Sequence, residues 1–477
     1  MISRGAIYFL LCFVFHFTFG ESGNNNNAKG QNLILLLIDG YSAELFNRTN
    51  AAIKVGAETL LSNGVHAEYL QPVFPTQSYP NWYSLATGLY VENHNFTSDY
   101  MYNENLDIYF ERDEGVNDTH HSWWDGLPDP LWYTVGKASI DVHCYWFATC
   151  HRAHRDLVVQ VPKARRHNFK DADNLDIFPH LPRMMKHIKK YQPYRQQLVL
   201  LRYNGVANAL RMFGEENDAI NEALSNADVL IRKIQEEMDS NELFETTNLM
   251  VISDHGLMDI YEDEKFYIED CLSDLAKVKH VVNSMSLMMI YPEEGEEDTV
   301  FFELKVCDQW APMGDYEGDE VPLVGIHRKR EIPEQYHWKN ARNIAPIVVI
   351  PRPGAVILTR HIKTNEVTEA NAKDYRMLSG WDNNYPEMHG IFMARGPAFK
   401  VDHTIPPLKI VDVYQIVMNV LGVEPGHKHN GTWSDVENML SDGWESRVED
   451  SSAFSQNTQN WPIFSSLLLS IIILRYL

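Results

Sequence analysis

The hydrophobic pattern of the chain is marked by short, continuous apolar runs that end abruptly in polar residues. The first run, residues 34–38, is followed at once by Asp39 and Gly40. The second run, residues 249–252, is followed by the sequence Ser-Asp-His-Gly, and residues 197–202 form a third run. Apolar runs of this length, bounded by turn residues, are typical of strands that are buried on both faces of a parallel sheet.

Helical periodicity separates these runs. Residues 218–238 show it most clearly, because apolar residues recur there at three- and four-residue spacing. Residues 51–61 and 411–421 have the same character, and Gly64 and Gly422 follow them as stop signals. Strands that alternate with helices predict an α/β fold, with a mostly parallel central sheet and helices on both faces.

Other stretches are less regular. Residues 65–70 alternate in the manner of a strand, and residues 391–393 return to an apolar run. Residues 103–129 are acidic and irregular, which predicts an excursion on the surface. Residues 257–375 show no clear period, and we expect a peripheral insert there.

The polar residues that follow the first two apolar runs are candidates for a metal site. Open α/β sheets bind ligands at the carboxyl ends of their strands, where Asp39, Asp254 and His255 are expected to lie. Taken alone, Asp39-Gly40 is more typical of a simple turn. Two buried strands that both end in carboxylate or imidazole donors nevertheless predict one shared metal site.

Charge excludes one class of partner. The chain has 477 residues and a formal net charge of −24, so it lacks the basic surface that a nucleic-acid polymer requires. This length can bury a large core, as one large α/β domain or as two smaller ones. We expect one α/β domain over residues 32–440.

The N-terminal residues predict entry into the secretory pathway. A basic residue, Arg4, precedes an apolar stretch, so residues 1–20 have the form of a signal peptide. Residues 21–31 are rich in asparagine and are expected to be a disordered leader. Four acceptor motifs for N-glycosylation agree with an extracellular or cell-surface location; they begin at Asn47, Asn95, Asn117 and Asn430.

The cysteine count agrees with this location. Cys12 is lost with the signal peptide, and an even number of cysteines remains for an oxidising compartment. The remaining four are Cys144, Cys150, Cys271 and Cys307. Four cysteines allow three pairings, and the sequence does not choose among them.

The C-terminal residues 441–477 combine a polar spacer with an apolar tail. Residues 463–474 are too few to span a bilayer, which needs about 20 apolar residues. Small residues at 451–453, the spacer and the short tail resemble a glycolipid-anchor signal, which would tether the protein to the outer membrane leaflet. The alternative is an amphipathic or disordered tail.

Several motifs together carry a family resemblance. They are Leu-Ile-Asp-Gly at residues 37–40, Phe-Pro-Thr-Gln-Ser-Tyr-Pro-Asn at 74–81 and Ser-Asp-His-Gly at 253–256. In this order and spacing they resemble the ectonucleotide pyrophosphatase/phosphodiesterase family of the alkaline phosphatase superfamily, from about residue 33 to about residue 436. The compact length is similar to that of the smaller members, including the choline-phosphodiesterase branch.

The resemblance implies an alkaline-phosphatase-like fold and a two-zinc mechanism. Thr76 matches the family's nucleophile, whose hydroxyl attacks phosphorus and forms a covalent intermediate. Two zinc ions would stabilise the attacking and leaving oxygens. The ligands of the first zinc match Asp39, Thr76, Asp254 and His255, so this half of the site is intact.

The other half departs from the family pattern. The positions of the second zinc's ligands are occupied here by Ala207, Arg211 and Ser379. The family also uses an asparagine amide to bind a phosphate oxygen, and Asp99 stands at that position. An ionised carboxylate can only accept hydrogen bonds, so Asp99 would repel the anion that the amide holds. We therefore expect one zinc site and not two.

Two interpretations follow from these departures. The favoured one is a pseudoenzyme that keeps the fold and one metal, has little or no turnover, and binds a ligand or a protein partner. The alternative is an active one-metal phosphodiesterase that hydrolyses nucleotide or choline phosphodiesters. In that enzyme the guanidinium of Arg211 would stabilise the charge that develops on the phosphate.

Overall fold

The computed structural model describes residues 30–111, 121–147, 150, 175–307, 313–316, 319–360, 375–442 and 444. The expected signal peptide, residues 21–29 of the leader, the acceptor Asn117 and nearly all of the C-terminal spacer and tail lie outside these residues. Within the described part of the chain, no helix is both long enough and apolar enough to cross a membrane.

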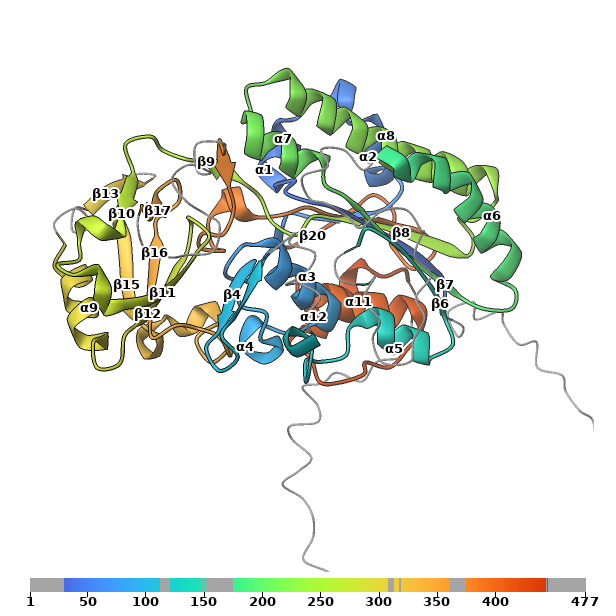
Figure 1. Ribbon diagram of the computed structural model, residues 1–477. Coiled ribbons are helices and arrows are strands. Elements are labelled where there is room, and N and C mark those ends of the chain that lie inside the picture. The colour runs from blue at the N-terminus through green and yellow to red at the C-terminus, as the bar shows by residue number, and fades with distance from the viewer. Residues whose placement is uncertain are drawn as a thin grey trace, which may run out of the picture.

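A seven-stranded sheet forms the centre of the described structure (Figure 1). Its strands β6, β7, β1 and β8 run parallel, and β19 pairs antiparallel with both β8 and β2. In spatial order the strands are β20 (His403–Ile405), β2 (Val65–Ala67), β19 (Phe392–Arg395), β8 (Thr247–Ile252), β1 (Asn32–Ile38), β7 (Gln197–Tyr203) and β6 (Asp141–Tyr145). The mostly parallel sheet that the apolar runs predict is confirmed.

Helices cover both faces of this sheet (Figure 1). Successive residues of a strand point to opposite faces, so Leu33 and Leu35 pack into one core cluster while Ile34 and Leu36 pack into the other. One face carries α2 (Val55–Leu61), α6 (Leu181–Tyr191), α7 (Gly205–Phe213) and α8 (Asp218–Ser240), and the other carries α3 (Ser78–Thr87), α5 (Leu131–Lys137) and α11 (Asp412–Leu421). Burial on both sides explains why the strands are apolar without alternation.

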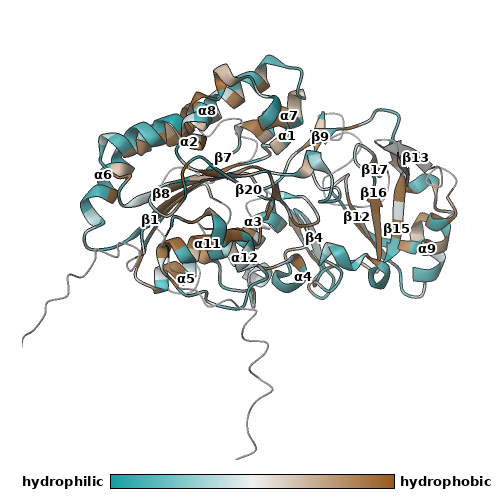
Figure 2. Ribbon diagram, turned by 180° about the vertical axis from the view of Figure 1, so that it is seen from behind, coloured by the Kyte–Doolittle hydropathy of each residue, from teal (hydrophilic) through white to brown (hydrophobic). Residues whose placement is uncertain are grey.

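The outer surface shows the complementary pattern. Figure 2 shows the central strands in hydrophobic colours and the outward faces of α6 and α8 as hydrophilic. Helix α8 agrees with the predicted range, and its buried residues follow the predicted period. Helix α11 ends at Leu421. The next residue, Gly422, has a φ of 66°, which is the left-handed conformation expected just after a helix C-terminus.

A second, smaller sheet lies beside the first and accounts for the peripheral insert (Figure 1). It is antiparallel, and α9 (Glu297–Lys305) packs against it around a separate apolar cluster. In spatial order its strands are β11 (Val278–Asn283), β12 (Met288–Pro292), β16 (Ile347–Pro351) and β15 (Val324–Arg328).

Short elements complete the described structure. The remaining helices are α1 (Ala43–Arg48), α4 (Val91–His94) and α12 (Trp433–Val436). The remaining strand pairs are β3 (Leu70–Gln71) with β21 (Leu408–Lys409), β4 (Tyr100–Asn103) with β5 (Ile108–Glu111), β9 (Met258–Asp259) with β18 (Met377–Leu378), β10 (Lys265–Tyr267) with β17 (Val356–Leu358), and β13 (Met313–Tyr316) with β14 (Asp319–Pro322).

Three local predictions need correction. Residues 103–129 are only partly a surface excursion, because Phe110 on β5 and Trp123 are buried in the main core. The acidic composition of this segment suggested exposure, but these two aromatic rings are apolar and are buried. The expected helix 51–61 begins with a 3₁₀ turn and becomes α-helical only at α2. The expected strand 65–70 is divided between β2 and β3.

The structure selects one of the three cysteine pairings. Cys144 is bonded to Cys150, and Cys271 is bonded to Cys307. The second bond links the segment before β11 to the end of α9, and it closes a loop with a sequence separation of 36 residues. A cross-link of this span lowers the entropy of the unfolded chain more than the short first one does.

Reduction of the Cys271–Cys307 bond is expected to destabilise the protein by about 3–4 kcal/mol, the value for a loop of this length in the chain-entropy model. The effect is isolated in a Cys144→Ala/Cys150→Ala background by urea unfolding with and without dithiothreitol. Adding Cys271→Ala and Cys307→Ala should make the protein insensitive to the reductant. Absence of a reductant effect in the background that keeps Cys271 and Cys307 would contradict this assignment.

Candidate metal centre

The polar residues that follow β1 and β8 meet at the carboxyl edge of the central sheet. Strands β1 and β8 are neighbours, and Leu37 pairs with Ile252, so both strands end at the same level. Asp39 follows β1, and Asp254 and His255 follow β8. The three side chains are buried, and each offers one ligand atom within 4.8 Å of the others.

The imidazole of His255 is oriented with one nitrogen toward the two carboxylates. Its Nδ1 lies 3.0 Å from the carbonyl oxygen of Gly256. A carbonyl can only accept, so in the neutral ring Nδ1 carries the proton and Nε2 presents a lone pair. Nε2 lies 3.5 Å from Asp254 Oδ2 and 3.9 Å from Asp39 Oδ1.

Three donors fix the carboxylate of Asp254. The backbone N–H groups of Gly40 and His255 donate to Oδ1 at 3.1 and 3.0 Å. The indole N–H of Trp82 donates to Oδ2 at 2.7 Å. Burial raises the pKa of Asp254, His255 counteracts this shift, and the nearby carboxylate of Asp39 adds to it.

These three residues fit a divalent cation. Two buried carboxylates and an imidazole lone pair converge there, and a cation between them would relieve the mutual repulsion of the carboxylates. Carboxylate and imidazole are the ligand types that zinc takes in open sites. Asp39, Asp254 and His255 would hold the ion, and the ion would supply Lewis-acid stabilisation of a bound phosphate.

The second set of positions does not fit a cation. Arg211, on α7, is buried and places Nη2 3.8 Å from Asp39 Oδ1. Ala207 lies one turn earlier, and its backbone N–H donates to the carbonyl oxygen of Asp39 at 3.1 Å. A guanidinium has no lone pair for a metal, and a methyl group has no donor. Arg211 therefore brings a positive charge to Asp39 where a metal ligand would bring a lone pair.

Thr76 is buried close to these residues but makes different contacts. Its hydroxyl accepts from the backbone N–H of Gly380 at 2.9 Å and donates to the carbonyl oxygen of Trp381 at 3.0 Å. Within the described residues, the hydrogen-bond partners of this hydroxyl all belong to residues 380–388. The hydroxyl that contacts His255 is that of Ser78, at 3.2 Å from Nε2.

Ser379 lies next to the segment that holds Thr76. Its side chain is 9% exposed, and its carbonyl oxygen accepts from the hydroxyl of Ser286 at 2.7 Å. Gly380 follows with φ of 115°, a conformation that L side chains rarely adopt. Of the three positions expected to depart from the family pattern, Ala207 and Arg211 therefore lie on α7, and Ser379 lies beside Gly380.

The side chain of Asp99 lies beside the N-terminus of α3. Its Oδ1 accepts from the backbone N–H of Tyr79 at 2.8 Å, in the first turn of that helix. A carboxylate is stabilised there by the unpaired N–H groups and by the helix dipole. The backbone N–H of Asp99 donates to Gln77 Oε1, which fixes the turn. Asp99 thus places a negative charge beside the segment that carries Thr76.

Two further residues belong to the centre and were missed by sequence reasoning. Trp82, on α3, donates to Asp254, and the guanidinium of Arg202 lies 4.5 Å from the centroid of its ring. Arg202 is the penultimate residue of β7 and is 1% exposed. A charged residue inside an apolar run is the signal that could have identified it, because buried arginines need partners.

Removing the indole donor of Trp82 is expected to weaken zinc binding by about 10–100-fold, the usual effect of losing a partner that orients a metal ligand. Trp82→Phe keeps an aromatic ring over Arg202. Trp338→Phe is a matched control, because its buried indole donates to the backbone carbonyl oxygen of Thr97 and not to a proposed metal ligand. Zinc affinity is measured by competition with a chelating dye. Equal affinities in the two variants would contradict this role.

The glycosylation acceptors within the described residues differ in exposure. Asn47 and Asn430 are exposed, and Asn95 is half-buried. The side-chain oxygen of Asn95 accepts from the backbone N–H of Arg342, and that of Asn430 accepts from the backbone N–H of Tyr90. Modification at these positions stays a prediction.

Comparison with known proteins gives a family match over most of the chain. The family model described as type I phosphodiesterase/nucleotide pyrophosphatase matches residues 33–382. The chain is 25% identical over 456 residues to bis(5'-adenosyl)-triphosphatase enpp4 of Xenopus laevis, covering 93% of this chain and 89% of the relative. It is 23% identical over 429 residues to the corresponding Homo sapiens protein, covering 89% and 85%.

Solved structures give the same fold. Murine ectonucleotide pyrophosphatase/phosphodiesterase 5 superimposes with a TM-score of 0.71 at 23% identity, covering 86% of this chain and all of that one. An inactive variant of that murine protein in complex with AMP gives a TM-score of 0.70 at 23% identity, with the same coverage. At this identity the likeness establishes the fold alone.

Proposed function

The chain belongs to the type I phosphodiesterase/nucleotide pyrophosphatase family, and we propose that it binds a phosphodiester with one divalent cation and has little or no turnover. Members of this family depend on metal ions, typically zinc. The observation that carries the proposal is the buried ion pair between Arg211 and Asp39. It neutralises Asp39 with a side chain at a position where the family resemblance expects a ligand of a second zinc.

Two further observations support low turnover. The hydroxyl of Thr76, the proposed nucleophile, donates its proton to the carbonyl oxygen of Trp381, and its hydrogen-bond partners among the described residues include no base. A nucleophilic hydroxyl needs an adjacent base or a metal to lose its proton. Asp99 adds a negative charge where the family resemblance expects an amide donor. Its repulsion would disfavour the charge that develops on a phosphate during transfer.

The alternative function is that of an active one-metal phosphodiesterase. One observation favours it: Arg211 lies beside a proposed zinc ligand, and its side chain is 8% exposed. A guanidinium in a water-poor site can stabilise developing phosphate charge more strongly than the same group in water. In this alternative, Thr76 would change its hydrogen-bond partner when substrate and metal bind.

A nucleotide is the favoured ligand class. The relatives in Xenopus laevis and Homo sapiens are named bis(5'-adenosyl)-triphosphatases, and the structure of one murine neighbour contains AMP. A choline phosphodiester remains the second class to test. We also propose that the protein is extracellular or at the cell surface, which the signal-like segment and the two disulfide bonds support.

The proposal is tested by comparing hydrolysis with binding in secreted protein loaded with zinc. Hydrolysis is followed with p-nitrophenyl esters of thymidine phosphate and of phosphocholine, and AMP binding is measured by calorimetry. We expect AMP to bind and hydrolysis to equal that of a Thr76→Ala control. Turnover that disappears in Thr76→Ala would overturn the pseudoenzyme proposal and support the one-metal enzyme. Absence of AMP binding would contradict the nucleotide class.

A further inference from the structure

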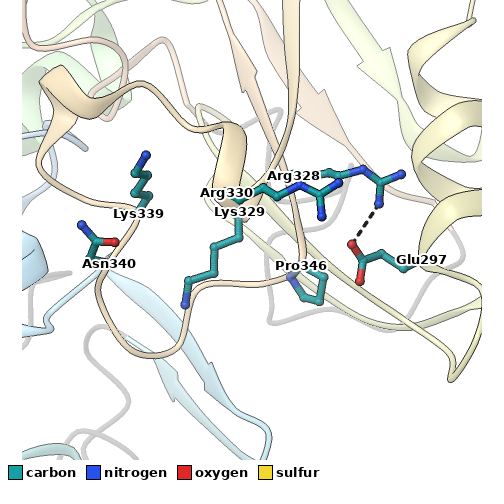
Figure 3. Close-up of a pocket in the computed structure, with 7 residues that line it drawn as sticks. All are labelled: Glu297, Arg328, Lys329, Arg330, Lys339, Asn340 and Pro346. Atoms are coloured by element: carbon teal, nitrogen blue, oxygen red, sulfur yellow. Dashed lines mark hydrogen bonds and ion pairs between the residues drawn. The ribbon is translucent and has the colours of Figure 1, made fainter.

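A pocket with basic walls lies on the smaller sheet, apart from the proposed metal centre (Figure 3). Its cavity has a volume of about 470 Å³. The lining comes from the start of α9, the end of β15, the turn after it and the loops that precede β16. We name it the basic pocket; its lining residues are Glu297, Arg328, Lys329, Arg330, Lys339, Asn340 and Pro346.

The cations of the basic pocket differ in how they are neutralised. Arg328 is 7% exposed and pairs with Glu297 at 3.0 Å and Asp298 at 2.5 Å, and its guanidinium lies over the ring of Phe301. These contacts fix Arg328 as a rigid part of the wall. Arg330 is largely exposed and pairs only weakly, with Nε 3.9 Å from a Glu331 oxygen.

Lys329 has no such acidic neighbour. Its Nζ donates to the carbonyl oxygen of Ala341 at 3.0 Å, which leaves two N–H groups available. In the described part of the chain, no carboxylate oxygen lies within 4.0 Å of this Nζ. Burial lowers the pKa of Lys329, and no acidic neighbour counteracts the shift. Its charge is therefore partly desolvated and not locally compensated, and an anion in the pocket would relieve both costs.

Lys339 can contribute to anion binding if its ammonium leaves its present carboxylate partner. Its Nζ pairs with Glu334, whose side chain is 78% exposed. The Lys339 side chain itself is only 19% exposed, but water can solvate the exposed carboxylate of Glu334, so the ammonium can exchange this carboxylate for a ligand. Lys329 is the first residue of the first short helical turn, and Lys339 follows the second one. Figure 3 shows their side chains at the same wall of the pocket, extending in different directions.

We propose that the basic pocket binds a small ligand that carries a tetrahedral oxyanion, a sulfate or phosphate group on a sugar-sized scaffold. Lys329 and Lys339 contact the oxyanion, and Arg328 forms the fixed wall beside it. Ammonium groups bind such anions through charge-assisted hydrogen bonds. The volume lies within the range of small-molecule sites, about 300–1,000 Å³, and exceeds what a bare oxyanion fills. Four basic residues in one pocket also stand out in a chain of net charge −24.

Calorimetry on the full secreted protein tests the proposal with three probes: glucose 6-sulfate, glucose 6-phosphate and glucose. Both anionic sugars are expected to bind, and glucose is not. Lys329→Gln keeps a donor for the carbonyl of Ala341 but removes the charge, and should weaken binding by about tenfold or more, the equivalent of one charge-assisted contact. Lys339→Gln should weaken it as well. The anionic sugar that binds with the higher affinity shows whether the pocket prefers a sulfate or a phosphate group.

Two controls separate this site from general charge and from the metal centre. Lys400→Gln removes one positive charge from a surface lysine that contacts Asn438, and should leave binding unchanged. Asp254→Asn disrupts the metal centre and should also leave it unchanged. Glucose binding as tightly as its esters would overturn the proposal. Unchanged affinity in both Lys329→Gln and Lys339→Gln would overturn it too, whatever the zinc and AMP measurements give.

Discussion

Introducing the ligands that the family resemblance expects for a second zinc should raise phosphodiesterase activity by about 10³-fold or more. The variant combines Ala207→Asp, Arg211→His and Ser379→His. The physical reason is that a second zinc supplies Lewis-acid stabilisation worth several kcal/mol, and about 1.4 kcal/mol corresponds to a tenfold rate. Hydrolysis of the p-nitrophenyl thymidine ester measures the rate, and mass spectrometry of the native protein counts the zinc ions.

The space beside residue 207 is limited on the side that faces Gly40. Ala207 packs against Gly40, and a Cβ added to Gly40 would lie 2.8 Å from the Cβ of Ala207. Because Gly40 has no side chain, this contact does not arise in the natural chain.

The same triple variant with Thr76→Ala is the control and should be inactive. Two zinc ions bound without any rise in rate would contradict the view that the lost metal site limits turnover.

Replacing Arg211 by methionine is expected to lower the free energy of unfolding of metal-free protein by about 3–5 kcal/mol. Methionine fills a similar volume but leaves the buried carboxylate of Asp39 without its cationic neighbour. Breaking a buried ion pair from one side costs this much because the remaining charge stays desolvated. Zinc should restore part of the stability, since an ion that binds only the folded state stabilises it. Urea unfolding with and without zinc measures both effects.

The matched control is Arg232→Met on α8. Arg232 forms an exposed i,i+4 pair with Glu236 at 3.0 Å, and such pairs contribute about 0.3–0.5 kcal/mol. Its loss should therefore change stability little, with or without zinc. An Arg211→Met protein as stable as the Arg232→Met protein in the absence of metal would show that the buried ion pair does not neutralise the centre.

The central strands and the meeting of the candidate metal ligands could be predicted from the sequence for a simple reason. A strand buried on both faces is apolar throughout, so a carboxylate directly after it, such as Asp39, stands out. Parallel strands bring their carboxyl ends to one edge, which placed Asp254 and His255 beside Asp39 before any contact was known. The position of Arg211 depended on the family motif and not on the hydrophobic pattern.

Contacts between distant segments could not be predicted in this way. Thr76 bonds to Gly380 and Trp381, about 300 residues away, and no local pattern encodes that pairing. The contact between Trp82 and Asp254 joins α3 to the end of β8 and likewise depends on the folded packing. The smaller sheet escaped detection for a related reason. A short turn joins β11 to β12, but long connections separate this pair from β15 and β15 from β16, and residues 257–375 show no period that would reveal the sheet.

The number of zinc ions that each chain binds tests the proposed one-metal centre directly. Secreted protein is equilibrated with zinc, and native mass spectrometry gives the stoichiometry. We expect one zinc per chain, lost in Asp254→Asn, because Asp39, Asp254 and His255 form one donor set and Arg211 occupies a position where the family resemblance expects a ligand of a second zinc. Two zinc ions per chain would contradict this expectation, and would mean that Arg211 does not replace the second metal.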